Sequence, residues 1–195
     1  ELARRVWEPG LTQRIISVDC HPRTRVYRDT PAAEIESALT GRRLANSRSH
    51  GKRLLFTFVA ASRPKASSVE HDAHLELHLG MSGRLFLADP EYEACRHDHF
   101  ILRTSKLALV YSDYRQFGRV FLHEPSDDPW ASLPREVLDR RFTLSYLHRI
   151  TARRGGTALK GLLLDQALFP GVGNWMADEI CWRLPCYPGS HLRDL

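Results

Sequence analysis

Apolar positions follow a strand-like pattern over the first two thirds of the chain and a helix-like pattern over the last third. Branched, aromatic and alternating apolar residues bounded by turn formers are typical of β-strands. They occur at residues 15–18 (weakly), 53–60, 74–79, 99–103, 107–111 and 119–122. The polar residues 62–73 predict a long hairpin loop, and residues 104–106 predict a short one.

Two helices are predicted before the strand-rich part. Residues 1–8 form the first, which a Pro-Gly pair ends, with Leu2, Val6 and Trp7 on its buried side. Residues 31–39 form the second, because their apolar positions recur three and four residues apart.

Two further helices meet at a glycine-rich corner near the end of the chain. Each helix has an apolar face in helical spacing. The first face comprises Leu159, Leu162 and Leu163, and the second comprises Ala177, Ile180, Cys181 and Leu184. Between the helices, Gly171 and Gly173 allow positive φ and close approach of the backbone. Asn174 as the cap of the second helix leaves N–H groups free at the positive end of the helix dipole. Such a corner suits a phosphate group.

Turn formers without periodicity at residues 124–130 mark a domain boundary. We therefore predict an α+β protein of two domains. Residues 1–124 form an N-terminal helix and an antiparallel β-sandwich, and residues 125–195 form an all-helical domain.

The 195 residues carry a formal net charge of +5, which favours a polyanionic partner, although a solvated surface explains such an excess equally well. Of the 28 basic residues only Lys52, Lys65, Lys106 and Lys160 are lysines, whose compact charge suits contact with a single phosphate. The absence of long apolar runs and of signal-peptide order predicts a soluble, cytoplasmic protein that does not enter membranes. Four cysteines without a C-x-x-C pair predict reduced thiols.

Two predicted turns carry side chains that suit insertion into a nucleic acid. Glycines on both sides of Met81 break the strand pattern and place it on a tight turn, unless Met81 simply continues the core face. Residues 113–118 (DYRQFG) place Arg115 and Phe117 on a loop between strands, unless Phe117 folds back onto the sheet. An apolar wedge fills the hole left by an extruded base, and a guanidinium pairs with the orphaned base.

Four segments together resemble the bacterial formamidopyrimidine-DNA glycosylases (Fpg, or MutM) of the Fpg/Nei group. They are HGKRLLF, HLGMSGRLFL, HDHFILRTSKLALVYSDYRQFG and LKGLLLDQALFPGVGNWMADE, in the family's order over nearly the whole chain. The HLGMSG segment is more similar to Fpg than to Nei. The resemblance identifies residues 157–184, approximately, as a helix-two-turn-helix motif.

The resemblance implies a base-excision repair enzyme, both DNA glycosylase and AP lyase. Such an enzyme flips an oxidised purine out of double-stranded DNA, cleaves its glycosidic bond and cuts the strand by β,δ-elimination. It works as a monomer on DNA with a damaged base or an abasic site. The implied residues are Met81, Arg115 and Phe117 as void fillers, His78, Gly173 and Asn174 at phosphates, Lys160 facing the DNA backbone, and Lys52, counted with the catalytic residues, on a hairpin at the phosphate near the lesion.

The chain departs from the family pattern at several places. Tyr114 stands where the family often has Pro, and Gln116 where it has a second Arg, which affects contact with the opposite base. The family's nucleophile is the amine of an N-terminal Pro, followed by a Glu that acts as acid and base. The resemblance matches neither residue in this chain, nor the C-terminal zinc finger. No metal site or cofactor is therefore expected in this chain, and zinc is expected in a full-length family member. The alternatives, Cys181 with Cys186 and His97 with His99, lack further ligands.

Three functions follow from these observations. The first is a truncated glycosylase, inactive as these 195 residues because the Pro nucleophile is missing. The second is a catalytically inactive paralogue that binds damaged or abasic DNA. The third is RNA binding, since helix-two-turn-helix corners also occur in ribosomal proteins, although the HLGMSGRL segment in a β-rich domain argues against it.

Overall fold

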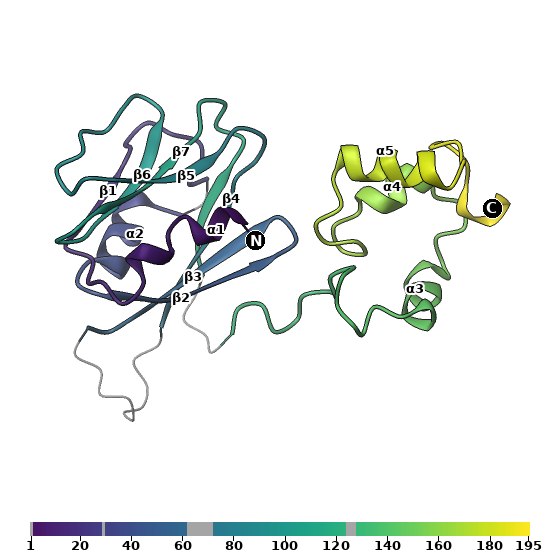
Figure 1. Cartoon of the computed structure of the whole chain (residues 1–195), viewed down its shortest axis with the longest axis horizontal. Coiled ribbons are helices and arrows are strands. Elements are labelled where there is room, and N and C mark those ends of the chain that lie inside the picture. The colour runs from purple at the N-terminus through teal and green to yellow at the C-terminus, as the bar shows by residue number, and fades with distance from the viewer. Residues whose placement is uncertain (1, 29, 62–71, 124–127) are drawn as a thin grey trace. The chain divides into compact units, whose positions relative to one another are not determined.

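The computed structural model describes residues 2–28, 30–61, 72–123 and 128–195. It divides into two compact units, which Figure 1 colours from purple to yellow along the chain. The sheet unit comprises Glu1–Ser49 and Arg53–Pro129, and the helical unit comprises His50–Lys52 and Trp130–Leu195. The three residues at the tip of one hairpin thus belong with the helices.

The sheet unit contains two four-stranded antiparallel sheets. The first has the order β1 (Ser17–Cys20), β6 (Asp98–Arg103), β7 (Ala108–Ser112) and β5 (Arg84–Ala88). The second has the order β2 (Arg43–His50), β3 (Arg53–Val59), β4 (Ala73–His78) and β8 (Arg119–Leu122). The predicted strands are confirmed, β8 with the predicted ends and the others with shifted ends, whereas β2 and β5 were not predicted. The predicted loop 62–73 lies, except for its last two residues, outside the described residues.

Both sheets contribute to one apolar core, in which Trp7 is fully buried. Its ring centroid lies 4.8 Å from that of Phe56 and 6.3 Å from that of Phe100. The predicted helix 1–8 is wrong in length: α1 (Leu2–Arg5) ends after one turn, and a 3-10 turn, η1 (Glu8–Gly10), follows. Because the helical spacing ends there, Leu2 and Val6 are exposed and only Trp7 turns into the core.

The second predicted helix is confirmed as α2 (Ala32–Leu39), which packs against β1. Pro31 precedes its first residue, where a missing N–H costs nothing. Ile35 and Leu39 lie one turn apart and are fully buried. This helix closes one side of the core.

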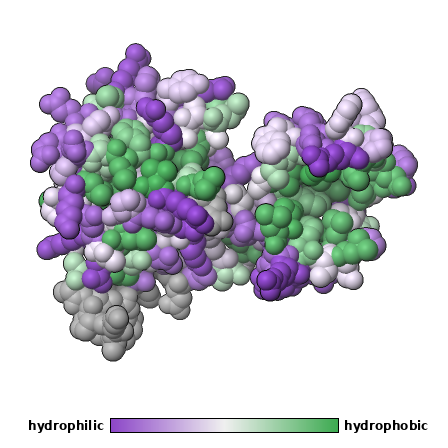
Figure 2. All heavy atoms as spheres, in the orientation of Figure 1, coloured by the Kyte–Doolittle hydropathy of each residue, from purple (hydrophilic) through white to green (hydrophobic). Residues whose placement is uncertain are grey.

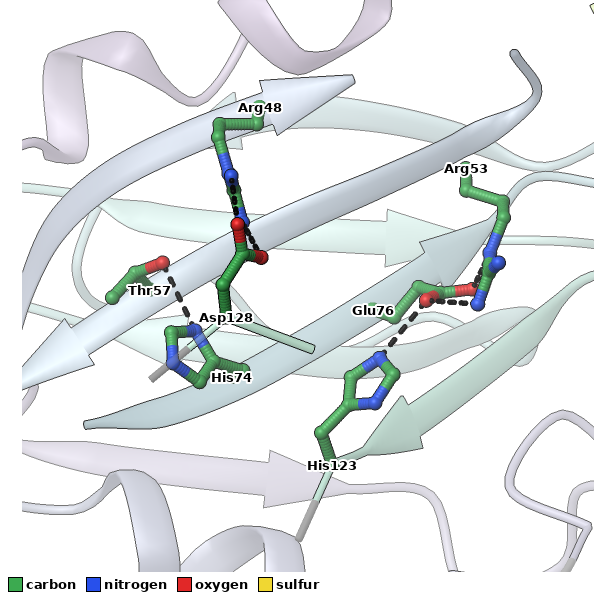
Figure 3. Close-up of polar contacts among 7 residues, drawn as sticks. All are labelled: Arg48, Arg53, Thr57, His74, Glu76, His123 and Asp128. Atoms are coloured by element: carbon green, nitrogen blue, oxygen red, sulfur yellow. Dashed lines mark hydrogen bonds and ion pairs between the residues drawn. The ribbon is translucent and has the colours of Figure 1, made fainter. Parts of the chain in front are cut away.

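A polar network lies on β3 and β4 (Figure 3). The Arg53 guanidinium donates to both carboxylate oxygens of Glu76, at 2.6 and 2.7 Å, and His123 Nε2 lies 2.9 Å from one of them. Thr57 Oγ1 lies 3.2 Å from His74 Nδ1. His74 and Glu76 are both buried although their neighbours Leu75 and Leu77 fill the core, so β4 is covered on both faces. A buried carboxylate of this kind requires the charge and the hydrogen bonds that Arg53 supplies.

The helical unit consists of α3 (Leu144–Thr151), α4 (Leu159–Leu164), α5 (Asn174–Arg183) and η2 (Leu192–Asp194), besides the hairpin tip. Its core contains the predicted Leu159, Leu162, Leu163, Ala177 and Cys181. Leu184 is 58% exposed because α5 ends at Arg183, so its predicted burial is wrong. The predicted α+β class, a β-sandwich followed by helices, is confirmed.

Polar residues cover much of the visible face of each unit, with apolar residues in patches between them (Figure 2). Among the described residues, no helix is long and apolar enough to cross a membrane.

Candidate nucleic-acid interface

A tight turn after β4 presents Met81 to solvent. Gly80 has a φ of +62°, and the N–H of Gly83 donates to the carbonyl of Leu79 at 2.8 Å. The side chain of His78 takes part in the turn, since its Nδ1 accepts from the N–H of Gly80 at 3.1 Å. Met81 is 76% exposed, so the alternative that it belongs to the core is wrong.

The loop between β7 and β8 presents two aromatic side chains. Tyr114 is 65% exposed and Phe117 is 51% exposed, so Phe117 does not fold into the sheet core. The guanidinium carbon of Arg115 lies 4.5 Å from the centroid of the Phe117 ring, which is a cation–π contact. Gln116 has a φ of +55°, and its Oε1 accepts from the N–H of Arg25 at 3.0 Å. The loop is thus anchored at its crest while its aromatic side chains stay accessible.

The two turns lie against each other. A Cβ added to Gly80 would lie 2.6 Å from the carbonyl carbon of Phe117 and 2.7 Å from the nitrogen of Gly118. Only glycine permits this close approach at position 80. The positive φ at this position also favours glycine. The structure therefore brings together three of the predicted residues, Met81, Arg115 and Phe117.

Asp113 is fully buried beneath this pair of turns. Its Oδ2 accepts from the N–H of Gly118 at 2.8 Å and from the Tyr111 hydroxyl at 3.4 Å. Its Oδ1 accepts from the N–H of Arg115 at 3.3 Å and from the hydroxyl of Ser82. Burial raises the pKa of this carboxyl, but the hydrogen bonds lower it more, so the pKa lies below its ordinary value. Burial, followed by the nearby Asp113 charge, raises the pKa of Tyr111. Asp113 is ionised at neutral pH.

The corner before α5 differs in detail from the sequence prediction. Gly171 has a φ of +92°, as expected, but Gly173 has an extended backbone with a φ of −111°. Gly173 is itself the N-cap residue and Asn174 is the first residue of the helix, so the prediction of Asn174 as the cap is wrong. A Cβ on Gly173 would lie 3.6 Å from the Lys52 ammonium, which shows how closely that lysine approaches.

Lys52 lies at this corner because the hairpin tip belongs to the helical unit. Its Nζ donates to the carbonyl of Val172 at 3.0 Å, and Gln166 Nε2 donates to the same carbonyl at 2.8 Å. The N–H of Gly51 donates to Glu136 Oε1 at 2.7 Å and fixes the tip. A cation therefore stands directly beside the N-terminus of a ten-residue helix.

Lys160 lies elsewhere on the helical unit and is engaged in an ion pair. Its Nζ is 2.6 Å from Asp178 Oδ1 on α5, so Asp178 neutralises its charge. Its role at a DNA backbone stays a prediction. No three His, Cys, Asp or Glu side chains gather into a metal site anywhere in the described parts of the chain.

Comparison with known proteins identifies the family. The model of the formamidopyrimidine-DNA glycosylase N-terminal domain matches residues 1–120. The chain belongs to the formamidopyrimidine-DNA glycosylase family. The match covers most of the sheet unit, including the two touching turns.

Individual members of the glycosylase family support this assignment. The Methylococcus capsulatus formamidopyrimidine-DNA glycosylase is 34% identical over 175 residues, which are 88% of this chain and 60% of that protein. The Exiguobacterium sibiricum enzyme is 32% identical over 193 residues, 96% of this chain and 66% of that protein. This chain thus spans about two thirds or less of the length of these relatives.

Solved glycosylase structures have the same fold. A Lactococcus lactis Fpg in complex with DNA that contains an abasic site matches with a TM-score of 0.79 and 25% identity, over 100% of this chain and 68% of that one. A MutM in complex with DNA that contains carbocyclic 8-oxo-G matches with a TM-score of 0.79 and 26% identity, over 100% and 70%.

Sequence reasoning missed several polar residues that organise the site in this glycosylase-family chain. Asp113 stood in the DYRQFG segment, but its role beneath the loop was not predicted, although an Asp at a strand end is a common turn anchor. Gln166 and Glu136 gave no local signal. Glu136 accepts from Gly51, 85 residues earlier in the chain, and Gln166 donates to the Val172 carbonyl that Lys52 also contacts.

Proposed function

We propose that this chain forms the lesion-recognition part of a base-excision repair DNA glycosylase with AP lyase activity, which removes oxidised purines of the formamidopyrimidine and 8-oxoguanine type from double-stranded DNA. Family membership supports the enzyme class. The solved relatives bound to abasic-site and 8-oxo-G DNA support the partner. The observation that carries the proposal is the exposure of Met81, Arg115 and Phe117 on two touching turns.

These three side chains match the requirements of base extrusion. Unstacking a base costs a few kcal/mol and leaves both an apolar hole and an orphaned base. Met81 and Phe117 supply apolar volume for the hole. Arg115 stacks on the face of Phe117 and keeps in-plane N–H donors for the edge of the orphaned base. The three side chains thereby replace the stacking and the hydrogen bonds that the extruded base had made in the duplex.

The helical unit supplies a phosphate site for the same DNA. The Lys52 ammonium has three donors, of which Val172 accepts one, so two remain for phosphate oxygens. The first N–H groups of α5 lie at the positive end of that helix and can donate to the same phosphate. His78 and Lys160 are further proposed phosphate contacts.

In the chemical step an amine attacks the sugar carbon that carries the damaged base, and the base leaves as the glycosidic bond breaks. The Schiff base that results breaks down by β,δ-elimination, in which the strand is cut and the sugar phosphates leave. The resemblance assigns this amine to an N-terminal Pro and the acid-base role to the Glu beside it. The residues of this chain would hold the DNA, fill the void and present the extruded nucleotide.

Two measurements test the proposal. The 195-residue chain should bind a duplex with an abasic-site analogue at least about tenfold more tightly than the intact duplex. The complete product of the gene, with whatever it encodes before Glu1 and after Leu195, should be trapped covalently on abasic DNA by borohydride. Equal affinity for both duplexes removes the lesion-recognition function. Tight binding without a trapped product removes the lyase activity.

Arg115→Ala separates recognition of the orphaned base from binding. We expect the preference among bases opposite the lesion to fall about tenfold, since a bidentate guanidinium contact is worth 1–3 kcal/mol, approximately, with a smaller loss of overall affinity. Binding titrations with each of the four opposite bases measure this. Arg84→Ala is the matched control, because Arg84 also stacks on a phenylalanine, at 5.3 Å, but lies outside the two turns. An equal loss for all opposite bases would contradict the role of Arg115.

A further inference from the structure

Asp113 receives hydrogen bonds from both turns that carry the void-filling residues. Ser82, which donates to Oδ1, is the residue next to Met81. Arg115 and Gly118, whose backbone N–H groups donate at 3.3 and 2.8 Å, lie on either side of Phe117. One carboxylate thus connects the Met81 turn with the Arg115–Phe117 loop.

The backbone of Asp113 is itself fixed by β6 and by His97, the residue before that strand. Its N–H donates to the carbonyl of His97 at 2.9 Å, and its carbonyl lies 2.8 Å from His99 Nε2. His99 is buried with 1% exposure. Asp113 is therefore an anchored point rather than a side chain that follows the loop.

Besides the close backbone contact at Gly80 and the bond from Gly80 to the His78 ring, few interactions hold the two turns. Met81 is 76% exposed and its turn is closed by a single backbone hydrogen bond, from Gly83 to Leu79. The loop is fastened at its crest through Gln116. Insertion into a base stack requires the wedge residues to keep their geometry against the stacked bases, which rigid support from beneath provides.

We propose that Asp113 is a positioning residue, which acts through Ser82 to lock the Met81 turn and the Arg115–Phe117 loop into one rigid insertion unit. This proposal rests on the proposed function of the three wedge residues. Charged acceptors form the stronger hydrogen bonds, so an ionised carboxylate serves this purpose better than a neutral side chain. Without the Ser82 link, Met81 and Phe117 enter the duplex independently and fill the void poorly.

Ser82→Ala tests the link without removing a wedge residue or the buried charge. The 195-residue chain is titrated onto a duplex that holds an abasic-site analogue with 2-aminopurine opposite, and onto the intact duplex. Fluorescence of 2-aminopurine reports its stacking and hence the insertion, which a general loss of stability does not reproduce. We expect the preference for abasic over intact DNA to fall about tenfold, as for one hydrogen bond to a charged group. The fluorescence change at saturation should fall with it.

Two further variants control this test. Ser82→Thr retains the hydroxyl and should restore both readouts. Ser112→Ala removes a neighbouring serine hydroxyl, which donates to the carbonyl of His97 at 3.1 Å and not to Asp113, and should behave as the parent chain. Asp113→Asn, which retains the size of the side chain, should show the same loss as Ser82→Ala if it folds.

The outcomes separate this proposal from the one on which it rests. If the parent chain prefers abasic DNA and Ser82→Ala leaves the preference and the fluorescence change intact, the positioning role is wrong and the proposed function stands. Equal losses in Ser82→Ala and Ser112→Ala, or failure of Ser82→Thr to restore the signal, also overturn it. If the parent chain itself shows neither preference nor fluorescence change, the proposed function fails and the positioning role fails with it.

Discussion

At the scale of single residues, His99 lies beneath the loop between β7 and β8, and its two ring nitrogens have different surroundings. Nε2 bonds to the carbonyl of Asp113, and Nδ1 is buried without a hydrogen-bond partner in the part of the chain that the structure describes. Because a carbonyl only accepts, Nε2 must carry the proton of the neutral ring. A second proton on Nδ1 would be buried without a partner, and burial accordingly lowers the pKa of His99.

This lowered pKa predicts a loss of stability in mild acid. Below a pH of about 6.5 the unfolded chain protonates this histidine, while the folded chain does not. The free energy of unfolding therefore falls as the pH drops from about 6.5 towards the folded pKa. Urea unfolding at pH 7.5 and 5.5 should show this fall.

His99→Gln removes the titration and keeps a donor for Asp113, so the fall between the two pH values should shrink. His191→Gln, in which an exposed histidine is lost, should leave the fall unchanged. An unchanged pH dependence in His99→Gln would show that other groups cause the acid sensitivity.

At the scale of elements, close contact holds the loop between β7 and β8 against the turn after β4. A Cβ added to Gly118 would overlap the Tyr111 hydroxyl and approach the His78 carbonyl to 2.7 Å. Gly118→Ala should therefore lower the free energy of unfolding by about 2–3 kcal/mol, as overpacking does. Gly156→Ala is the control, because nothing lies within 4 Å of its added Cβ, and should change stability by less than about 0.5 kcal/mol.

Tyr111→Phe checks the cause of this loss. Removing the hydroxyl should recover part of the stability in the Gly118→Ala chain and cost about 1 kcal/mol in the parent chain, where its bond to Asp113 is lost. If Tyr111→Phe destabilises both chains equally, the overlap is not the reason.

The sequence predicted elements where their own residues carry the pattern. β3, β4, β6 and β7 are short runs of mostly buried residues, and α2 buries Ile35 and Leu39 one helical turn apart. β2 was missed because only Leu44 and Ser47 of its eight residues are buried. Of the site, the exposed wedge residues were predicted from their turns, whereas Asp113, Gln166 and Glu136 were not. Glu136 bonds to Gly51 and Asp113 to Ser82 across distant segments, and Gln166 shares the Val172 carbonyl with Lys52, so no local pattern reveals these roles.

At the scale of the whole molecule, the net charge of +5 should favour DNA binding mainly through those cations that contact phosphates. Each phosphate contact releases a counterion, so the logarithm of the DNA association constant falls linearly with the logarithm of salt concentration. Lys52→Ala should reduce the slope of that line by about 0.9 for the loss of one contact. Affinity should fall similarly for intact and abasic DNA. Fluorescence anisotropy titrations between about 50 and 200 mM salt measure both.

Lys106→Ala is the matched control for this prediction. Lys106 is an exposed lysine on the short turn between β6 and β7, and its loss removes the same formal charge. It should change affinity slightly and leave the slope unchanged. Equal slopes for the two variants would mean that net charge, rather than the site at the α5 corner, determines the salt dependence.

The hairpin tip has a consequence for how this protein can be recombined. The contact between Lys52 and Val172 joins residues 120 positions apart. Gly51, with a φ of +56°, lies so close to Gly171 that a Cβ would approach its nitrogen to 2.7 Å. If two relatives exchange their helical units at a single crossover near residue 130, the hairpin tip comes from one relative and the residues 171–172 that it contacts come from the other. Chimaeras that transfer residues 50–52 together with the helices keep the tip and its contact residues from the same relative. A substitution at Gly51 or Gly171 requires a compensating change at the other position.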